Sequence, residues 1–199
     1  MKTIQLSEQD MRSRLARYRE LSPLTIQSDP SIPTEARDVI YARQLMSVIG
    51  LENADTPINR SAPIIGAGGI TMTLAVCPPG QGPSLHNHAQ TYETFTVLKG
   101  RFEVTWNDNG SGCVSLETWD TLSVPPGVCR AFRNIGTEEA VLQVIISGGV
   151  HDMNDIAFTQ ASADRIRGIA PDALSRFEAQ GFRFNAGVEV PSVGAQPLA

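Results

Sequence analysis

Two histidines and a glutamate near the middle of the chain have the types and spacing that favour metal chemistry. His86 and His88 are separated by one residue, so on a strand both side chains leave the same face. Glu93 follows five residues later within 91–98, TYETFTVL, a run typical of a strand. Two imidazoles and one carboxylate can form the ligand set of non-haem Fe(II) sites, with positions open for substrate and oxygen. The alternative is that the histidines are solvated loop residues beside a turn.

The spacing around this group resembles the first motif of the cupin superfamily. Gly80, five residues, His86-x-His88, four residues, Glu93, six residues and Gly100 stand at every fixed position of that motif. The resemblance implies a divalent metal held by His86, His88 and Glu93, with Fe(II) favoured. Manganese, nickel and zinc stay open. So does a metal-free barrel in which these side chains hydrogen-bond one another and water.

The second motif of the superfamily follows at 119–134, WDTLSVPPGVCRAFRN, with two departures. Pro125, Gly127 and Asn134 fall in their expected places. Trp119 stands where the family has glycine, and Arg130 stands where it has the third metal-binding histidine. A guanidinium group stays protonated and offers no lone pair, so Arg130 cannot replace a histidine ligand.

Arg130 and Glu93 are the candidate catalytic residues, and two hypotheses describe Arg130. Because arginine binds carboxylates through two parallel hydrogen bonds, Arg130 could clamp an acidic substrate near the metal. Otherwise it pairs with Glu93 and no metal binds. Gln90 and Tyr92 are further candidate substrate-binding residues. His151, beyond the last expected strand, is a candidate substitute ligand, although a surface histidine is the commoner explanation.

Short segments bounded by glycine, proline or asparagine predict an antiparallel sandwich or barrel. The expected strands are 70–77, 91–98, 101–106, 113–116, 121–124, 128–134 and 140–147. Of these, 91–98 and 101–106 are expected to form a hairpin across the turn at Lys99 and Gly100. Together with the motifs, this pattern predicts an all-β cupin double-stranded β-helix, a jelly-roll barrel with helical extensions at both termini.

The expected organisation is an N-terminal helix and arm in 1–64, the barrel in 65–150, and helices with a loose tail in 151–199. Ser7 and Asp10 favour a helix start, and the helix is expected to reach about Glu20. The stretch 38–50 is ambiguous between helix and strand. Two C-terminal helices are expected at 162–169 and 172–180, with the tail beginning at residue 182.

Composition fits one domain with extensions, since the chain has 199 residues, 41% hydrophobic and 19% charged. A net charge of −5 argues against a nucleic-acid partner. Three cysteines without close pairs suggest neither a disulfide framework nor a structural zinc site. No stretch approaches the ~20 apolar residues of a membrane span, and the N-terminus lacks the apolar region of a signal peptide. We expect a cytoplasmic protein with a small-molecule substrate and, by resemblance, a homodimer.

The resemblance implies several functions. The first is a metal-dependent enzyme of dioxygenase type that acts on an organic acid or phenolic compound inside the barrel. The second is an isomerase, epimerase or lyase in which Glu93 or His88 moves a proton. The third is a barrel without catalysis that senses a small acid.

Overall fold

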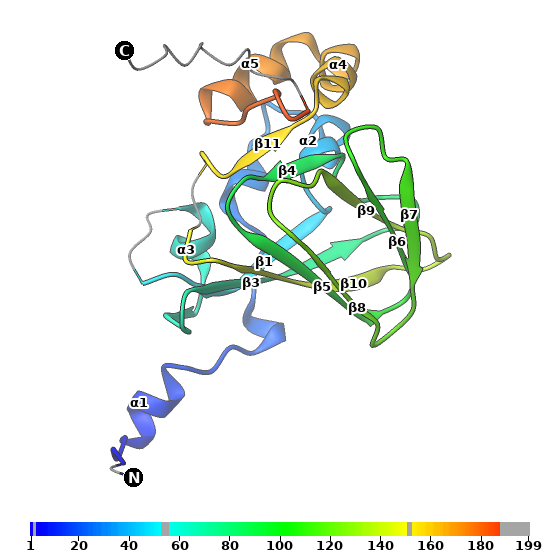
Figure 1. The fold of residues 1–199 in the computed structure, drawn as a ribbon. Coiled ribbons are helices and arrows are strands. Elements are labelled where there is room, and N and C mark those ends of the chain that lie inside the picture. Colours follow the sequence, from blue (N-terminus) through cyan, green and yellow to red (C-terminus); the bar gives the residue numbers. More distant parts are fainter. Residues whose placement is uncertain (2, 53–55, 151–152, 188–199) are drawn as a thin grey trace, which may run out of the picture.

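The computed structural model of the chain describes residues 1, 3–52, 56–150 and 153–187. Its centre is a barrel of two facing β-sheets, with helices over one end (Figure 1). The strands of one sheet are β1 (Gln44–Gly50), β2 (Ile64–Ile65), β3 (Ile70–Cys77), β5 (Tyr92–Lys99), β8 (Thr121–Val124) and β10 (Ala140–Ser147). The strands of the other are β4 (His86–His88), β6 (Phe102–Trp106), β7 (Gly112–Leu116), β9 (Arg130–Asn134) and β11 (Ile156–Phe158). Among the described residues the strand orders are β2-β1-β3-β10-β5-β8 and β11-β4-β9-β6-β7.

Alternating side chains explain why these segments form strands with one buried face. On β5 the side chains of Glu93, Phe95 and Val97 are buried, and every second residue of β10 is buried as well. The inward residues form a core between the sheets that includes Phe95, Val97, Phe102, Val104, Phe132 and Leu142. The predicted all-β barrel is confirmed, and three expected strands match residue for residue: 70–77, 121–124 and 140–147.

The expected hairpin between 91–98 and 101–106 is wrong. β5 pairs with β10 and β8 in one sheet, whereas β6 pairs with β7 and β9 in the other. Gly100, with φ of 85°, therefore lies at a corner where the chain crosses between sheets. A Cβ added there would lie 2.6 Å from the Cβ of Ala140. Hairpins and corners both use a glycine in the left-handed region, so the local sequence did not distinguish them.

The N-terminal helix is much shorter than expected. The helical segments that come before β2 in the chain are α1 (Glu8–Arg12), η1 (Tyr18–Glu20), η2 (Thr25–Ser28), α2 (Thr34–Ile40) and α3 (Pro57–Ser61). The predicted start of α1 is confirmed, because Ser7 and Asp10 form a reciprocal capping box. The predicted apolar face does not reach a core: Met11, Leu15 and Tyr18 are 57%, 47% and 59% exposed. Without burial to support it, a short helix does not propagate.

The ambiguous stretch 38–50 contains both element types, since α2 ends within it and β1 follows. β1 pairs antiparallel with β3 along its length. The sheet therefore begins at Gln44, and the boundary expected at residue 65 falls inside the barrel. On the outer face of β1, Met46 and Val48 are buried in a cluster with Leu74 and Val76 of β3.

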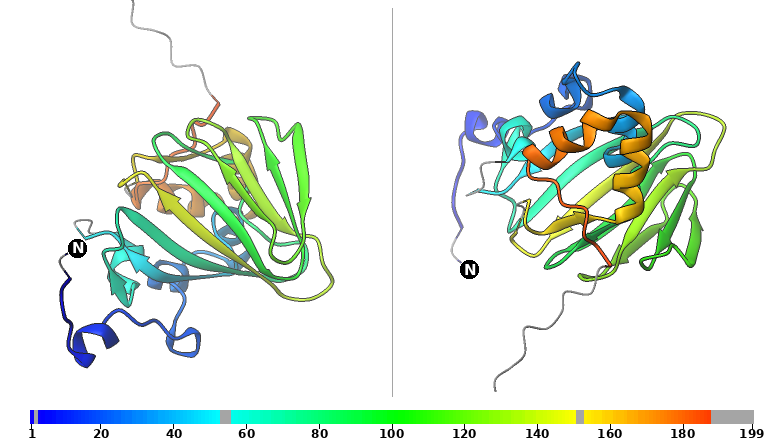
Figure 2. Two further views of the ribbon diagram at one scale, coloured as in Figure 1. Left: turned by 60° about the horizontal axis from the view of Figure 1, so that its bottom comes forward. Right: turned by 90° about the horizontal axis from the view of Figure 1, so that it is seen from above.

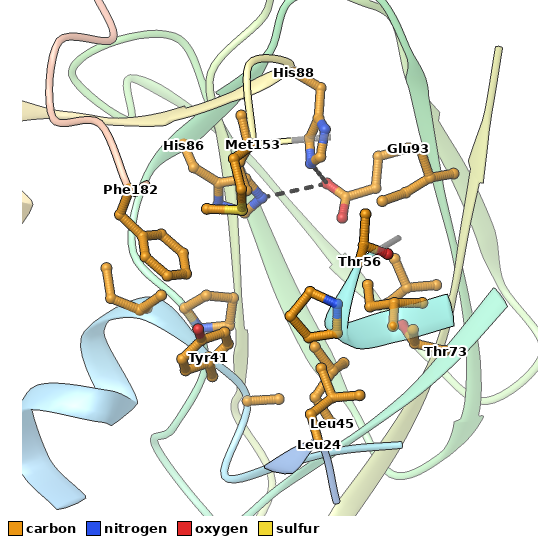
Figure 3. A pocket seen from close by; sticks show the side chains of 18 of the residues that line it. Leu24, Tyr41, Leu45, Thr56, Thr73, His86, His88, Glu93, Met153 and Phe182 are labelled. Carbon is orange, nitrogen blue, oxygen red and sulfur yellow. Dashed lines mark ion pairs between the residues drawn. The ribbon is translucent and has the colours of Figure 1, made fainter. Parts of the chain in front are cut away.

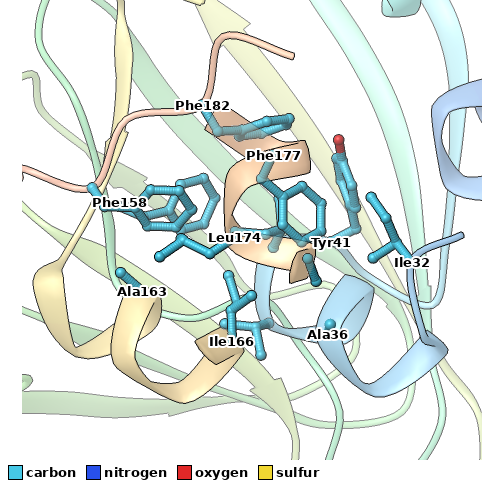
Figure 4. Packing of buried hydrophobic residues seen from close by; sticks show 13 residues of the cluster. Ile32, Ala36, Tyr41, Phe158, Ala163, Ile166, Leu174, Phe177 and Phe182 are labelled. Carbon is cyan, nitrogen blue, oxygen red and sulfur yellow. The ribbon is translucent and has the colours of Figure 1, made fainter. Parts of the chain in front are cut away.

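The C-terminal segment packs over one end of the barrel as two helices, α4 (Gln160–Ile169) and α5 (Pro171–Ala179) (Figure 2). Together with α2 they enclose an aromatic cluster that includes Tyr41, Phe158, Phe177 and Phe182 (Figure 4). The loose tail expected from residue 182 is wrong for its first residues. Phe182 is buried, and the Phe158 amide donates to the carbonyl of Arg183 at 2.7 Å. The rest of that expected tail, 188–199, lies outside the described residues.

None of the helices in the described ranges has both the length and the apolar character that crossing a membrane requires.

Candidate metal centre

His86, His88 and Glu93 converge on one point inside the barrel. The two histidines leave β4 on one face, as predicted, and Glu93 approaches from β5 in the opposite sheet. Oε2 of Glu93 lies 3.4 Å from Nε2 of His86 and 3.9 Å from Nε2 of His88 (Figure 3). All three side chains are buried, and their candidate ligand atoms lie within 4.8 Å of one another. One ion between these atoms could bind all three.

The other ring nitrogen of each histidine contacts an acceptor outside this group. Nδ1 of His86 lies 2.9 Å from the carbonyl oxygen of Ser84, and Nδ1 of His88 lies 2.9 Å from Oδ2 of Asp155. A carbonyl and a carboxylate only accept, so each contact places the ring proton on Nδ1. The Nε2 lone pairs are then free and face Glu93, which is the orientation that metal-binding histidines need.

Charge states in the cluster also suit a cation. Burial lowers the pKa of His86 despite the nearby Glu93 carboxylate, so its imidazole is neutral at neutral pH. Burial alone would raise the pKa of Glu93. The neighbouring His86, His88 and Arg130 outweigh that effect and hold the pKa at about 2. Oε2 of Glu93 has no hydrogen-bond partner within the described part of the chain. The lone pairs of the two Nε2 atoms thus face the ionised carboxylate of Glu93.

Asp155 is a site residue that the sequence analysis missed. It precedes β11, whose antiparallel pairing with β4 brings it beside His88. Its Oδ2 also accepts from the Thr91 hydroxyl at 2.6 Å, and its Oδ1 accepts from the Gln90 amide at 2.6 Å. Burial would raise the pKa of Asp155, but these bonds hold it at about 2. No motif marks Asp155, since its partner His88 is 67 positions away in the sequence.

Arg130 reaches Glu93 from β9, where its backbone pairs with His86. Its side chain is fully buried, with Nε 3.5 Å from Oε2 of Glu93, and Nη2 donates to the carbonyl of Pro125 at 3.2 Å. Arg130 does not line the neighbouring cavity. Arg130 thus adds a buried positive charge beside Glu93.

A cavity of about 150 Å³ opens onto the cluster (Figure 3). Its wall is largely apolar and combines the N-terminal arm, the barrel and the C-terminal segment, with side chains that include Leu24, Leu45, Phe132, Ile146, Met153 and Phe182. The extensions expected outside the barrel thus contribute to the wall of this cavity. Gln90 and Tyr92 are not part of this lining, and Tyr92 is 50% exposed. The candidate ligand His151 lies outside the described residues.

Trp119, which departs from the second motif, faces solvent and does not fill the barrel. Its side chain is 75% exposed. Its φ of 78° lies in the left-handed region, which glycine adopts at no steric cost. The backbone at this position therefore has a conformation that favours glycine.

Two sheets closed into a barrel, with a buried His-His-Glu cluster inside, define a double-stranded β-helix protein with a candidate metal centre. Residues 73–146 match the cupin domain family, and this range holds both motifs. This match confirms the resemblance to the cupin superfamily over that segment.

Similar proteins match parts of the chain. Over 76 residues the chain is 36% identical to polyketide synthase CurC of Streptomyces cyaneus. The aligned segment is 38% of this chain and 47% of that protein. The chain thus spans about half the length of that relative. A Bacillus halodurans structure is 21% identical with a TM-score of 0.41, covering 45% of this chain and 70% of its own. The DMSP lyase DddQ of Ruegeria pomeroyi is 18% identical with a TM-score of 0.43, covering 54% and 48%.

Proposed function

We propose that this chain is a metal-dependent enzyme of dioxygenase type that acts on an organic acid or phenolic substrate inside the barrel. One observation carries the proposal. Nε2 of His86 and Nε2 of His88 present lone pairs to an ionised Oε2 of Glu93, and no described residue donates a hydrogen bond to that oxygen. Acceptors this close repel one another unless a cation lies between them.

The donor set fits Fe(II) best among the divalent metals. Two imidazole nitrogens and one carboxylate are the ligands of non-haem iron oxygenases. Arg130 stands where the family has a third histidine ligand. A bound ion would therefore have more coordination positions for other molecules. When bound, Fe(II) supplies a redox centre with room for both substrate and oxygen.

The residues of the chain hold and shield this centre. Ser84 and Asp155 fix the imidazole protons on Nδ1, so that both Nε2 atoms stay available. Arg130 offsets the charge of Glu93 in the barrel interior. The apolar wall of the cavity limits the access of water and would hold the apolar part of a substrate beside the cluster. The homodimer and the cytoplasmic location stay predictions.

Metal content tests the centre directly. Protein purified without a histidine tag should contain about one equivalent of iron or manganese per chain, and His86→Ala should lose it. Gln90→Ala is the matched control, because that side chain is exposed and lies outside the cavity. If neither wild type nor control retains metal after reconstitution, the metal centre is wrong.

Oxygen dependence tests the reaction type. The loaded protein should consume oxygen with aromatic or keto acids and should be inactive in anaerobic buffer. Turnover without oxygen would instead favour the isomerase or lyase alternative. Binding that stabilises the protein without any turnover would favour a sensing role.

A further inference from the structure

The cavity has an apolar wall on the side opposite the metal cluster. Leu24 and Leu45 line it there, whereas His88 and Glu93 line the other end (Figure 3). Leu24 is buried on the N-terminal arm, and Leu45 is half-buried on β1. Among the described residues that line the cavity, none is lysine or arginine. A charged group that reached this wall would therefore be buried without a counter-ion, which is costly, so the wall suits hydrocarbon.

Hydrogen bonds hold the arm to β1 at this wall. The Leu24 amide donates to the Leu45 carbonyl at 3.0 Å. Gln27 bridges the chain just before and within β1. Its Nε2 donates to the Ala42 carbonyl at 2.8 Å, and its Oε1 accepts from the Leu45 amide at 2.8 Å. The two leucine side chains are thus fixed by polar bonds on neighbouring backbone as well as by apolar packing.

The volume of the cavity limits the body that fits between the cluster and this wall. A cavity of about 150 Å³ with apolar walls has room for a benzene-sized molecule. A tail that extends several carbons beyond such a ring would meet Leu24 and Leu45. Overfilling a packed interior forces side chains and backbone to move, which opposes binding.

We infer that Leu24 and Leu45 determine the length of the substrate, which ends in a compact apolar tail against them. This length limit does not need the metal. The polar head of the same molecule rests on the proposed function, because it would bind at the His-His-Glu cluster.

Two alkylbenzenes test the length limit on metal-free protein by NMR titration. Butylbenzene is three carbons longer than toluene, and Leu24→Ala and Leu45→Ala each remove three carbons from the wall. From apolar area alone, three added CH₂ groups should strengthen binding by about 60-fold. Wild type should lack this gain and bind butylbenzene no more tightly than toluene. Each alanine variant should recover about tenfold of it or more.

Leu21→Ala is the matched control. Leu21 lies on the same arm but packs against the cluster on the outer face of β1 and β3, and it does not line the cavity. This variant should keep the wild-type ratio of the two affinities. Because the ratio compares two ligands on one protein, a general loss of stability does not change it.

Three results would overturn the inference. The first is wild type that already binds butylbenzene about 60-fold more tightly than toluene, since nothing would then limit the tail. The second is a wild-type ratio in both Leu24→Ala and Leu45→Ala. The third is the absence of toluene binding to wild type at millimolar concentration.

Metal-loaded protein separates the inference from the proposed function. 4-Methylbenzoate and 4-butylbenzoate add an acid group to the same two tails and should repeat the pattern of the neutral pair. If the neutral pair shows the pattern while metal or acid binding fails, the proposed function is wrong and the length limit stands. If metal and both acids bind but the two leucine variants keep the wild-type ratio, the length limit is wrong and the metal centre stands.

Discussion

Replacing Asp155 with asparagine should switch the ring proton of His88 and weaken the metal site. The amide oxygen of Asp155→Asn can keep the bond from the Gln90 amide, now 2.6 Å from Oδ1. Its NH₂ group then takes the place of Oδ2, which lies 2.9 Å from Nδ1 of His88. An NH₂ group donates, so Nδ1 must become an acceptor and the proton must move to Nε2. Nε2 would then face Glu93 as a donor and could not bind a metal.

The expected magnitude follows from the role of such outer partners. Loss of a group that orients a metal-bound histidine costs about 10–100-fold in metal affinity. That is about 1.4–2.8 kcal/mol. The substitution also removes a charge-assisted hydrogen bond, worth about 1.5–3 kcal/mol of stability. A drop in stability by itself therefore does not test the reasoning, and the proton position must be measured.

Two assays on the same samples separate these effects. Nitrogen NMR of the imidazole rings in metal-free protein should place the His88 proton on Nδ1 in wild type and on Nε2 in Asp155→Asn. Competition against a chelator of known affinity gives the change in metal affinity. Asp38→Asn is the matched control, because it removes an ion pair with Arg43 and leaves the contact between Asp155 and His88 unchanged.

The reasoning is refuted if Asp155→Asn keeps the wild-type metal affinity and the His88 proton stays on Nδ1. Equal losses of affinity in Asp155→Asn and Asp38→Asn would point to general destabilisation. In that case the contact between Asp155 and His88 would not orient the ligand.

Trp119→Gly should raise the free energy of unfolding by about 1 kcal/mol in urea titrations, because the left-handed backbone strains any residue with a Cβ. Trp119→Ala keeps the Cβ and should show no such gain, so equal stability of the two variants would contradict this account. Arg130→Met leaves Glu93 without its buried cation, so the metal-free protein should lose about 3 kcal/mol while metal affinity rises. Calorimetry should then show a larger increase in Tm on metal addition than wild type gives, and an unchanged increase would argue that Arg130 does not influence the metal. In acid, unfolded protein binds the Glu93 proton near pH 4.5 whereas the folded pKa is about 2. The stability of metal-free protein should therefore fall between those pH values, by on the order of 3 kcal/mol. Glu93→Gln should show a flatter pH dependence of its unfolding midpoint, and identical slopes would exclude Glu93 as the titrating group.

Features encoded over a few residues could be predicted from the sequence. The spacing of His86 and His88 placed both side chains on one face, because strand side chains alternate with a period of two. The same alternation gave the strands 70–77, 121–124 and 140–147. Failures occurred where distant burial decided the outcome. The helix expected to reach Glu20 lacked a core to pack against, and the turn at Gly100 joined two sheets instead of two neighbouring strands.

By itself the sequence determined the barrel and three residues of its candidate metal centre, since glycines, prolines and alternating side chains act through nearby backbone. Tertiary structure alone decided what surrounds that centre. It brought Asp155 to His88 across 67 positions, set Arg130 against Glu93, and closed the cavity with both terminal extensions. These contacts depend on strand pairing and burial between segments far apart in the chain. Local periodicity does not predict which distant segments pair. The contacts between lone pairs and charges in the site are therefore seen only in the folded chain.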